Sequence, residues 1–300
     1  MKVWKVAALT APLLAAGAFG VTLIRYSRKW IVSPRVIFDP PHDDYVEVAS
    51  FQSPDGVPLR GWLLRGDPAR PAIILCHGYQ RSMEEPFSLA VELRHRGFTV
   101  MLFDFRGCGR SGGPYTTIGH DEPEDLVAAA RWLRHRLGPD LPIGVLGISM
   151  GGAVAIEGAA RVPDIAAVVT DSAFAHLSGA MEHRFSTLRG FNLHAHRVTM
   201  RIAERMCRGR VAAVRPVDVI DRIAPRPILL IHGSRDGIVP LSHLDELYAA
   251  ANEPKEQWVV QGTTHAMARM DVPHEYVSRV AAFFDDALTE PAIEPARLLI

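Results

Sequence analysis

Residues 147–152 read "GISMGG", between the apolar run "LPIGVL" and the small, apolar stretch "AVAIEGAARV". The pattern predicts a strand that turns sharply into a helix at Ser149. The flanking glycines, Gly147 and Gly151, leave room for a strained turn that lifts the serine toward a substrate and a base. The alternative is a Gly/Ser turn without chemical meaning. A nucleophilic serine needs a base, an orienting acid and an oxyanion hole, so the rest of the chain decides between the two.

Short apolar runs alternate with helical stretches along most of the chain. Such alternation, with continuously apolar strands, predicts a mostly parallel α/β sheet covered by helices on both faces. Asp55-Gly56 lies between two alternating runs near the front and predicts an antiparallel hairpin. The predicted strands after this hairpin are 71–78, 98–107, 141–147, 165–171, 226–233 and 256–262.

The stretch 172–221 interrupts this alternation. It is long for a connection between two strands and rich in helix formers, as in "MEHRFSTLRGF" and "RVTMRIAERMCRG". An insertion at the carboxyl end of a strand lies over the edge where open α/β sheets bind their ligands. We therefore expect a short helical cap, with an ordinary structural crossover as the alternative.

Two polar residues follow later strands of the predicted sheet. Asp236 stands in "HGSRDGIVP" and His265 in "QGTTHAMAR", each directly after a strand. The order serine, aspartate, histidine is the one expected for a catalytic triad on this architecture. Ser149, Asp236 and His265 are thus the predicted nucleophile, acid and base. Asp171, which ends the strand 165–171, is the alternative acid.

The loop "LCHGYQRS" at 75–82 follows an early strand. An oxyanion hole takes one N–H from the residue after the nucleophile and one from this loop. These groups are predicted to be the backbone N–H of Met150 and of Tyr79. His77 and Gly78 are expected to shape the loop and support the site.

These motifs together resemble the α/β-hydrolase fold serine hydrolases. The segments that carry the resemblance, between about residues 45 and 288, are "PDGVPLRGWLL", "CHGYQ", "FDFRGCGRSGG", "GISMGG", "RPILLIHGSRDGIVP" and "TTH". The stretch "PVDVIDRIAPRPILLIHGSRD" is similar to that of the membrane-anchored, Bem46-like abhydrolase-domain proteins. The resemblance implies the same triad and the same two oxyanion donors. Relatives with dehalogenase or epoxide hydrolase activity use an aspartate nucleophile, which Ser149 does not match.

Within the first 30 residues, the run from Val6 to Ile24 carries no charged side chain. As a helix this run is about 28 Å long, close to the apolar thickness of a bilayer. Basic residues flank it and Trp4, Tyr26 and Trp30 stand at its edges, where membrane proteins carry aromatic anchors. We expect a transmembrane anchor at 1–30, with a cleaved signal peptide or a buried helix as alternatives. The flanking charges favour a cytoplasmic catalytic domain.

The sequence divides into the anchor, a linker at 31–44, a hydrolase domain at 45–288 with its cap, and a tail at 289–300. Formal net charge is zero and no basic stripe suggests a nucleic-acid partner. The three cysteines lack metal-ligand spacing, and no phosphate-binding glycine motif occurs. We expect neither metal nor cofactor.

The expected function is cleavage of carboxylic ester or thioester bonds in small-molecule or lipid acyl substrates. The reaction would pass through an acyl-enzyme on Ser149. A peptidase or amidase on the same triad is the alternative within enzymes. The alternatives outside enzymes are a non-catalytic hydrolase-fold binding protein and a membrane-tethered interaction domain.

Overall fold

The computed structural model describes the backbone of residues 3–37, 39, 44–186 and 193–289. Side chains are described over the same ranges, except for residues 3–16, 185–186, 193–196, 211 and 289. The predicted tail at 289–300 lies outside these residues from 290 onward.

Eight strands in the described chain form one sheet in the order β1-β2-β4-β3-β5-β6-β7-β8. The pairs β1–β2 and β2–β4 are antiparallel, and every other neighbouring pair is parallel. The mostly parallel sheet and its antiparallel hairpin are therefore confirmed. The strands are β1 (Val46–Gln52), β2 (Pro58–Leu64), β3 (Ala72–Cys76), β4 (Thr99–Asp104), β5 (Ile143–Ile148), β6 (Ile165–Asp171), β7 (Ile228–Gly233) and β8 (Lys255–Val260).

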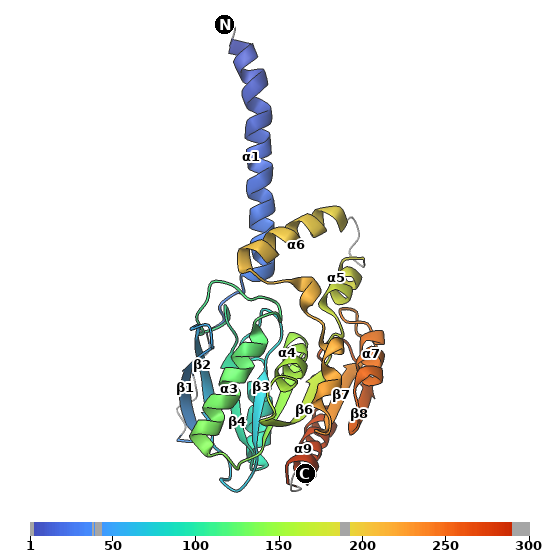
Figure 1. The fold of residues 1–300 in the computed structure, drawn as a ribbon. Helices are drawn as coiled ribbons and strands as arrows, with labels where there is room; N and C mark the ends of the chain where they lie inside the picture. Colours follow the sequence, from blue (N-terminus) through green and yellow to red (C-terminus); the bar gives the residue numbers. More distant parts are fainter. Residues whose placement is uncertain (1–2, 38, 40–43, 187–192, 290–300) are drawn as a thin grey trace, which may run out of the picture.

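Helices cover both faces of this sheet, as Figure 1 shows. On β3, Ile74 and Cys76 belong to the core on one face, whereas Ile73 and Leu75 belong to the core on the other. This alternation follows from the two-residue period of a strand and explains why β3 is apolar throughout. The first face packs against α3 (Glu122–Leu137), α4 (Met150–Ala159) and α7 (Ser242–Ala250), and the second against α2 (Phe87–His95), α8 (Ala268–Asp271) and α9 (Pro273–Thr289).

The described residues between β6 and β7 form two helices and three short 3-10 turns. The helices α5 (Leu177–Ser186) and α6 (Leu193–Cys207) lie beyond the carboxyl ends of the strands (Figure 1). The turns are Val211–Ala213, Pro216–Asp218 and Ile220–Ile223. Helix α6 packs across the base of α1 (Val3–Ile31), so the cap and the N-terminal helix meet at one end of the domain.

The C-terminal turns of α1 pack into the hydrolase domain. Ser27 and Ile31 are fully buried, and Ile31 belongs to the core that contains α4. Thr116 donates its backbone N–H to the carbonyl of Ile31 at 2.8 Å. The last turns of α1 are thus continuous with the domain, although the remainder of the helix projects away from it (Figure 1).

The prediction of a transmembrane anchor at 1–30 falls partly on residues whose side chains lie outside the described set. Among the described residues, no helix has the length and apolar character needed to cross a membrane. The structure therefore does not support the predicted transmembrane helix, and of that prediction only the helical conformation from Val3 onward is seen.

The three cysteines are unpaired. Cys76 and Cys108 are buried, and burial raises the pKa of both thiols, that of Cys108 to about 12. Cys207 is half-buried, and burial raises its pKa as well.

Candidate active site

Ser149 lies at a strained turn between β5 and α4. Its backbone has φ +54° and ψ −114°, a conformation that a non-glycine residue rarely adopts. A Cβ on Gly147 would come 2.0 Å from the carbonyl oxygen of Gly151, and one on Gly151 would come 2.3 Å from the carbonyl oxygen of Cys76. Glycine is therefore required at both positions, and the turn presents the serine hydroxyl at the carboxyl end of the sheet.

The two predicted partners of Ser149 lie beside it. His265 follows β8, and its Nε2 is 2.9 Å from the Oγ of Ser149. Its Nδ1 is 2.7 Å from the Oδ2 of Asp236, in the loop after β7. A neutral ring with its proton on Nδ1 donates to the carboxylate and accepts the serine hydroxyl at Nε2. The three side chains form the hydrogen-bonded chain that a serine nucleophile requires.

Asp236 is held in place by contacts on both carboxylate oxygens. Its Oδ1 accepts the backbone N–H groups of Ile238 and Val239, each at 2.9 Å. Burial alone would raise the pKa of this carboxyl. The hydrogen bond and charge of His265, together with the two N–H donors, nevertheless hold the pKa below its ordinary value. Asp236 is therefore ionised at neutral pH and fixes the orientation of His265.

His232 is a supporting residue that the sequence reasoning missed. It lies at the end of β7, is buried, and donates from Nε2 to the carbonyl of Val239 at 2.9 Å. The same nitrogen is 3.4 Å from the Oδ2 of Asp236. Burial lowers the pKa of His232, so it packs as a neutral ring beneath the acid. Its place four residues before Asp236, in "HGSRD", was the available signal.

The alternative acid, Asp171, is near enough to His265 to interact with its charge, but among the described residues it shares no hydrogen bond with that ring. It is buried at the end of β6, where its Oδ1 accepts the hydroxyl of Ser172 at 3.0 Å. Burial raises the pKa of Asp171 to about 6. The hydrogen bond from His265 goes to Asp236 instead, so the geometry selects Asp236 as the orienting carboxylate.

The predicted oxyanion donors flank the serine. Met150 is the first residue of α4, where a helix leaves its N–H groups without partners inside the helix. Within the described residues, neither its N–H nor that of Tyr79 is engaged in a hydrogen bond. Both residues line the same cavity as Ser149. Two N–H groups are therefore available where negative charge would develop in an acyl transfer reaction.

The loop that carries Tyr79 is fixed by two side chains. His77 is buried, donates from Nδ1 to the carbonyl of Gly78 at 2.8 Å and accepts the N–H of Phe105 at Nε2. The carboxylate of Glu85 accepts the N–H of Gly78 at 2.5 Å. Glu85 was not anticipated from the sequence, because its contact depends on how the loop folds back.

A cavity of about 560 Å³ opens in front of Ser149 and His265. Its lining is mostly apolar and comes from the strand ends, the cap and the end of α1. The helices α1 and α5 contribute the apolar Tyr26, Trp30, Leu177, Ala180 and Met181. The charged residues of the lining are Arg81 and Glu85, from the loop after β3, and Arg184 of α5. An apolar cavity next to one polar catalytic group is typical of a site for acyl groups.

One cluster of described residues has metal-ligand composition. The ligand atoms of His176, His243 and Glu246 lie within 4.8 Å of one another. The Nδ1 of His243 accepts the N–H of Ala175 and that of His176 accepts the N–H of Gly179, both at 3.1 Å. A ring that accepts an N–H at Nδ1 carries its proton on Nε2, so it has no lone pair there to offer a metal. In the cluster, the Nε2 of His176 lies 3.3 Å from the Oε2 of Glu246, and the rings of His176 and His243 contact each other with centroids 4.7 Å apart.

Comparison with known proteins identifies the family to which this chain belongs. A family model for the alpha/beta hydrolase fold matches residues 71–200. The uncharacterized protein YfhR of Escherichia coli O157:H7 is 30% identical over 234 residues, which cover 75% of each chain. The chain belongs to the α/β-hydrolase family.

Other α/β-hydrolases are similar over much or part of the chain. The Pyrococcus furiosus esterase Pf2001 superposes with a TM-score of 0.73 and 29% identity, covering 86% of this chain and 98% of the esterase. The thiohydrolase aneE of Aspergillus aculeatus is 37% identical over 119 residues, which cover 38% of this chain and 37% of the relative. These α/β-hydrolases support hydrolase activity. The finer similarity to the membrane-anchored, Bem46-like group stays a prediction.

Proposed function

We propose that the protein is a serine hydrolase that cleaves carboxylic ester or thioester bonds of acyl substrates through an acyl-enzyme on Ser149. The observation that carries this proposal is the continuous chain of contacts, 2.9 Å from Ser149 to His265 and 2.7 Å from His265 to Asp236. The apolar cavity before it supports an acyl substrate. The esterase and the thiohydrolase named above support these two bond types.

The first half of the reaction forms the acyl-enzyme. The Nε2 of His265 takes the proton of the Ser149 hydroxyl as Oγ attacks the substrate carbonyl carbon. The N–H groups of Tyr79 and Met150 donate to the oxygen that becomes negative. His265, now positive and oriented by Asp236, gives its proton to the leaving alcohol or thiol as the bond to the carbonyl carbon breaks.

The second half releases the acid. Water gives a proton to His265 Nε2 and attacks the acyl carbon, the same N–H groups bind the second oxyanion, and the Ser149 hydroxyl is restored. No metal or cofactor enters these steps. An amide would need stronger protonation of its leaving nitrogen, so peptidase or amidase activity is the alternative on the same residues.

The test uses the full chain, because the end of α1 lines the cavity. We expect a fluorescent fluorophosphonate to label the protein, and a series of p-nitrophenyl esters and matching thioesters to be hydrolysed. Both activities should disappear in Ser149→Ala and remain in Ser278→Ala, which removes an exposed serine of α9. A folded protein that neither labels nor turns over any acyl substrate would contradict the enzyme and favour a non-catalytic binding protein.

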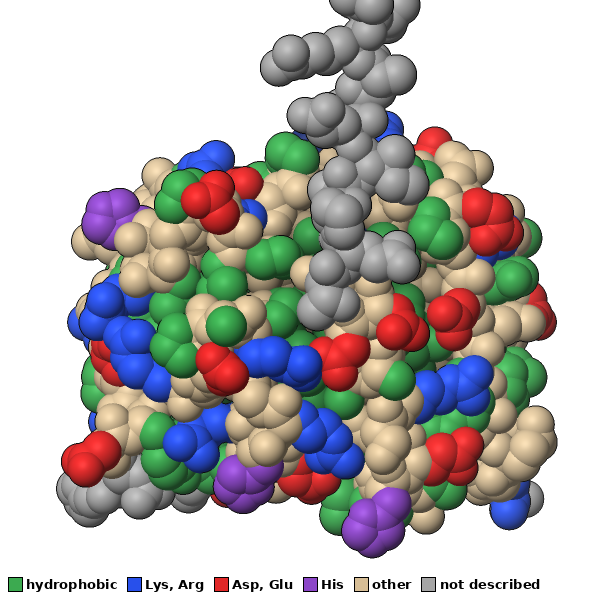
Figure 2. Space-filling model, turned by 90° about the horizontal axis from the view of Figure 1, so that it is seen from below, with side chains coloured by type: hydrophobic (Ala, Val, Ile, Leu, Met, Phe, Trp, Pro, Cys, Tyr) green, Lys and Arg blue, Asp and Glu red, His purple; other side chains and the backbone are tan. Residues whose placement is uncertain are grey.

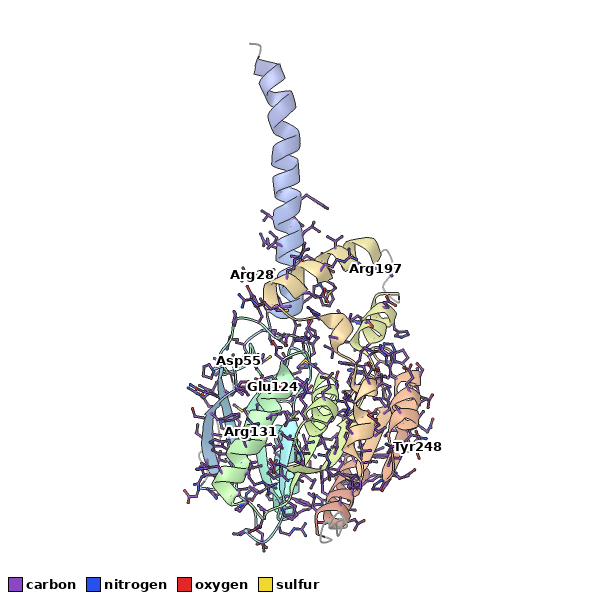
Figure 3. All side chains as sticks on the ribbon, in the orientation of Figure 1. Arg28, Asp55, Glu124, Arg131, Arg197 and Tyr248 are labelled. Carbon is purple, nitrogen blue, oxygen red and sulfur yellow. The ribbon has the colours of Figure 1, made fainter. Side chains whose placement is uncertain are left out.

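We also propose that the protein works at a membrane surface through its N-terminal helix, with the catalytic domain on the cytoplasmic side. Arg25, Arg28 and Lys29 are exposed near the base of α1, and α6, which packs against α1, carries the exposed Arg197 and Arg201. Figure 3 shows Arg28 and Arg197 at this end of the domain. The opposite end of the domain mixes both signs of charge (Figure 2). A cluster of cationic side chains next to an apolar segment attracts anionic lipid headgroups.

Vesicle flotation tests the membrane proposal. The protein should float with vesicles containing phosphatidylglycerol and float less when Arg25, Arg28 and Arg201 are replaced by Glu. N-terminal sequencing of the protein from cells tests the alternative, since a signal peptide would be cleaved off as the domain is exported and the mature chain would begin after it. Protease protection in spheroplasts reports which side the domain faces.

A further inference from the structure

The catalytic cavity is lined in part by residues that precede the hydrolase domain in the sequence. Tyr26 and Trp30, on the last turns of α1, line the same cavity as Ser149 and His265. More than one hundred residues separate them from Ser149 in the chain, and no motif joins them. The end of α1, which precedes the hydrolase domain in the sequence, is therefore also part of the cavity wall.

The backbone next to these two aromatic residues is hydrogen-bonded to the loop at 75–82, here called the oxyanion loop because it carries the N–H of Tyr79. The hydroxyl of Tyr79 donates to the carbonyl of Trp30 at 2.5 Å, and the side-chain amide of Gln80 donates to the carbonyl of Lys29 at 2.6 Å. Burial, with the nearby Cys108, raises the pKa of Tyr79, which keeps its hydroxyl protonated as a donor. The loop that supplies the oxyanion N–H is thus tied to the helix that carries Tyr26 and Trp30.

The two rings form a shaped apolar surface. Tyr26 and Trp30 contact each other edge to face, with ring centroids 6.2 Å apart and an interplanar angle of 75°. Leu177, Ala180 and Met181 of α5 line the same cavity. Charged side chains also line the cavity: Arg81 and Glu85 pair with each other at 3.5 Å, and Arg184 of α5 adds a positive charge to an otherwise apolar helical side. The helical side of the cavity therefore offers apolar contact to the part of a substrate beyond its carbonyl group.

We propose that Tyr26 and Trp30 are specificity-determining residues that bind the acyl chain and set the preference for acyl groups longer than acetyl or butyryl. This inference rests on the proposed serine hydrolase function. A short acyl group reaches the oxyanion donors and Ser149 without needing the aromatic pair. A longer chain gains binding free energy from the rings because its methylene groups leave water.

The experiment compares variants of the full chain on acetyl, octanoyl and palmitoyl p-nitrophenyl esters. For Tyr26→Ala/Trp30→Ala we expect KM for the two longer esters to rise tenfold or more, since each buried methylene and ring contributes to binding. The kcat for the acetyl ester and the rate of fluorophosphonate labelling should stay within about threefold. Phe19→Ala and Val21→Ala are matched controls, because these exposed residues lie on the same helix outside the cavity. They should behave as the wild type.

Conservative replacement keeps the test independent of folding. Trp30→Phe should retain most of the chain-length preference, whereas Trp30→Ala should lose it, with the melting temperature recorded for each. An equal fall in labelling and in kcat for all three esters would show that α1 only stabilises the oxyanion loop. An unchanged chain-length profile in the double variant would show that the pair does not bind the acyl group. Either result overturns this inference while wild-type labelling at Ser149 still supports the proposed function.

Discussion

The cavity has two walls of different construction. The strand-end wall consists of Tyr79, Ser149, Met150 and His265, and the helical wall consists of Tyr26 and Trp30 of α1 with the α5 side chains. In the strand-end wall the proposed reacting groups are hydrogen-bonded to one another, and backbone atoms approach so closely that glycine is required. The helical wall presents mostly apolar side chains, with Arg184 of α5 as a charged member. The difference separates the chemistry, which needs fixed hydrogen bonds, from selection of the substrate, which needs contact area.

The largest effect should come from breaking the hydrogen-bond chain behind the strand-end wall. Asp236→Asn keeps the shape but loses the charge that orients His265, so kcat should fall about 10³–10⁴-fold for every acyl length. Steady-state kinetics across the ester series measures this fall. Asp245→Asn removes an exposed carboxylate from α7 and should leave kcat unchanged. A loss confined to long esters would place Asp236 among the selecting residues instead.

The next effect tests the close backbone approach at the nucleophile turn. Gly151→Ala inserts a methyl group 2.3 Å from the carbonyl oxygen of Cys76, so the turn must shift. Overpacking of this kind costs about 1–3 kcal/mol, and we expect a melting temperature lower by roughly 3–10 °C. Fluorophosphonate labelling should slow at least tenfold. Gly237→Ala, where a new Cβ meets nothing within 4 Å, is the matched control. Equal behaviour of the two variants would refute the steric argument.

A smaller effect, on KM for long acyl esters alone, should distinguish the helical wall from the strand-end wall. Met181→Ala removes apolar contact area, so KM for an octanoyl ester should rise roughly fivefold, while kcat for an acetyl ester stays within about twofold. Met270→Ala removes an exposed methionine of α8 that does not line the cavity and should change neither value. A parallel drop in kcat for both esters would show that the two walls are not separable.

The smallest effect on activity is expected inside α4, the helix that follows Ser149. Burial raises the pKa of Glu157 to about 7, from an ordinary value of 4.5. The folded protein therefore holds this proton more tightly than the unfolded chain does, and its stability falls as pH rises from about 4.5 to about 7. Glu157→Gln should not lose stability over this pH range, because an amide does not ionise. Its free energy of unfolding should match the wild type near pH 4.5 and exceed it at pH 8 by on the order of 1–3 kcal/mol.

Urea unfolding at the two pH values measures this difference. Glu124→Gln is the control, because the Glu124 side chain is 43% exposed and pairs with the same residue, Arg161. Labelling at Ser149 should be unchanged in both variants. A stabilisation of Glu157→Gln that is equal at pH 4.5 and pH 8 would rule out ionisation as its cause.

The two walls also differ in how far the sequence predicts them. Ser149, Asp236 and His265 each follow a strand at a glycine-marked turn, and parallel strands bring their carboxyl ends to one edge. Their meeting could therefore be predicted, although their catalytic roles stay predictions. Glu85 acts through a contact that depends on loop folding, which no local pattern encodes, whereas His232 had a local signal in its place four residues before Asp236. From the sequence, Tyr26 and Trp30 were expected to stand at the membrane interface. Their place in the cavity was not foreseen, because their packing near the loop at 75–82 is a long-range contact that no motif marks.

The protonation of the cysteines has a practical consequence for measuring this enzyme. A thiol reacts with electrophiles as its thiolate, and burial keeps Cys76 and Cys108 protonated well above neutral pH. Cys207 is shifted in the same direction. Reagents that acylate or phosphonylate serine should therefore report Ser149 with little thiol background. Because the three cysteines are unpaired, the assay needs no thiol reductant, which would itself cleave the ester and thioester substrates.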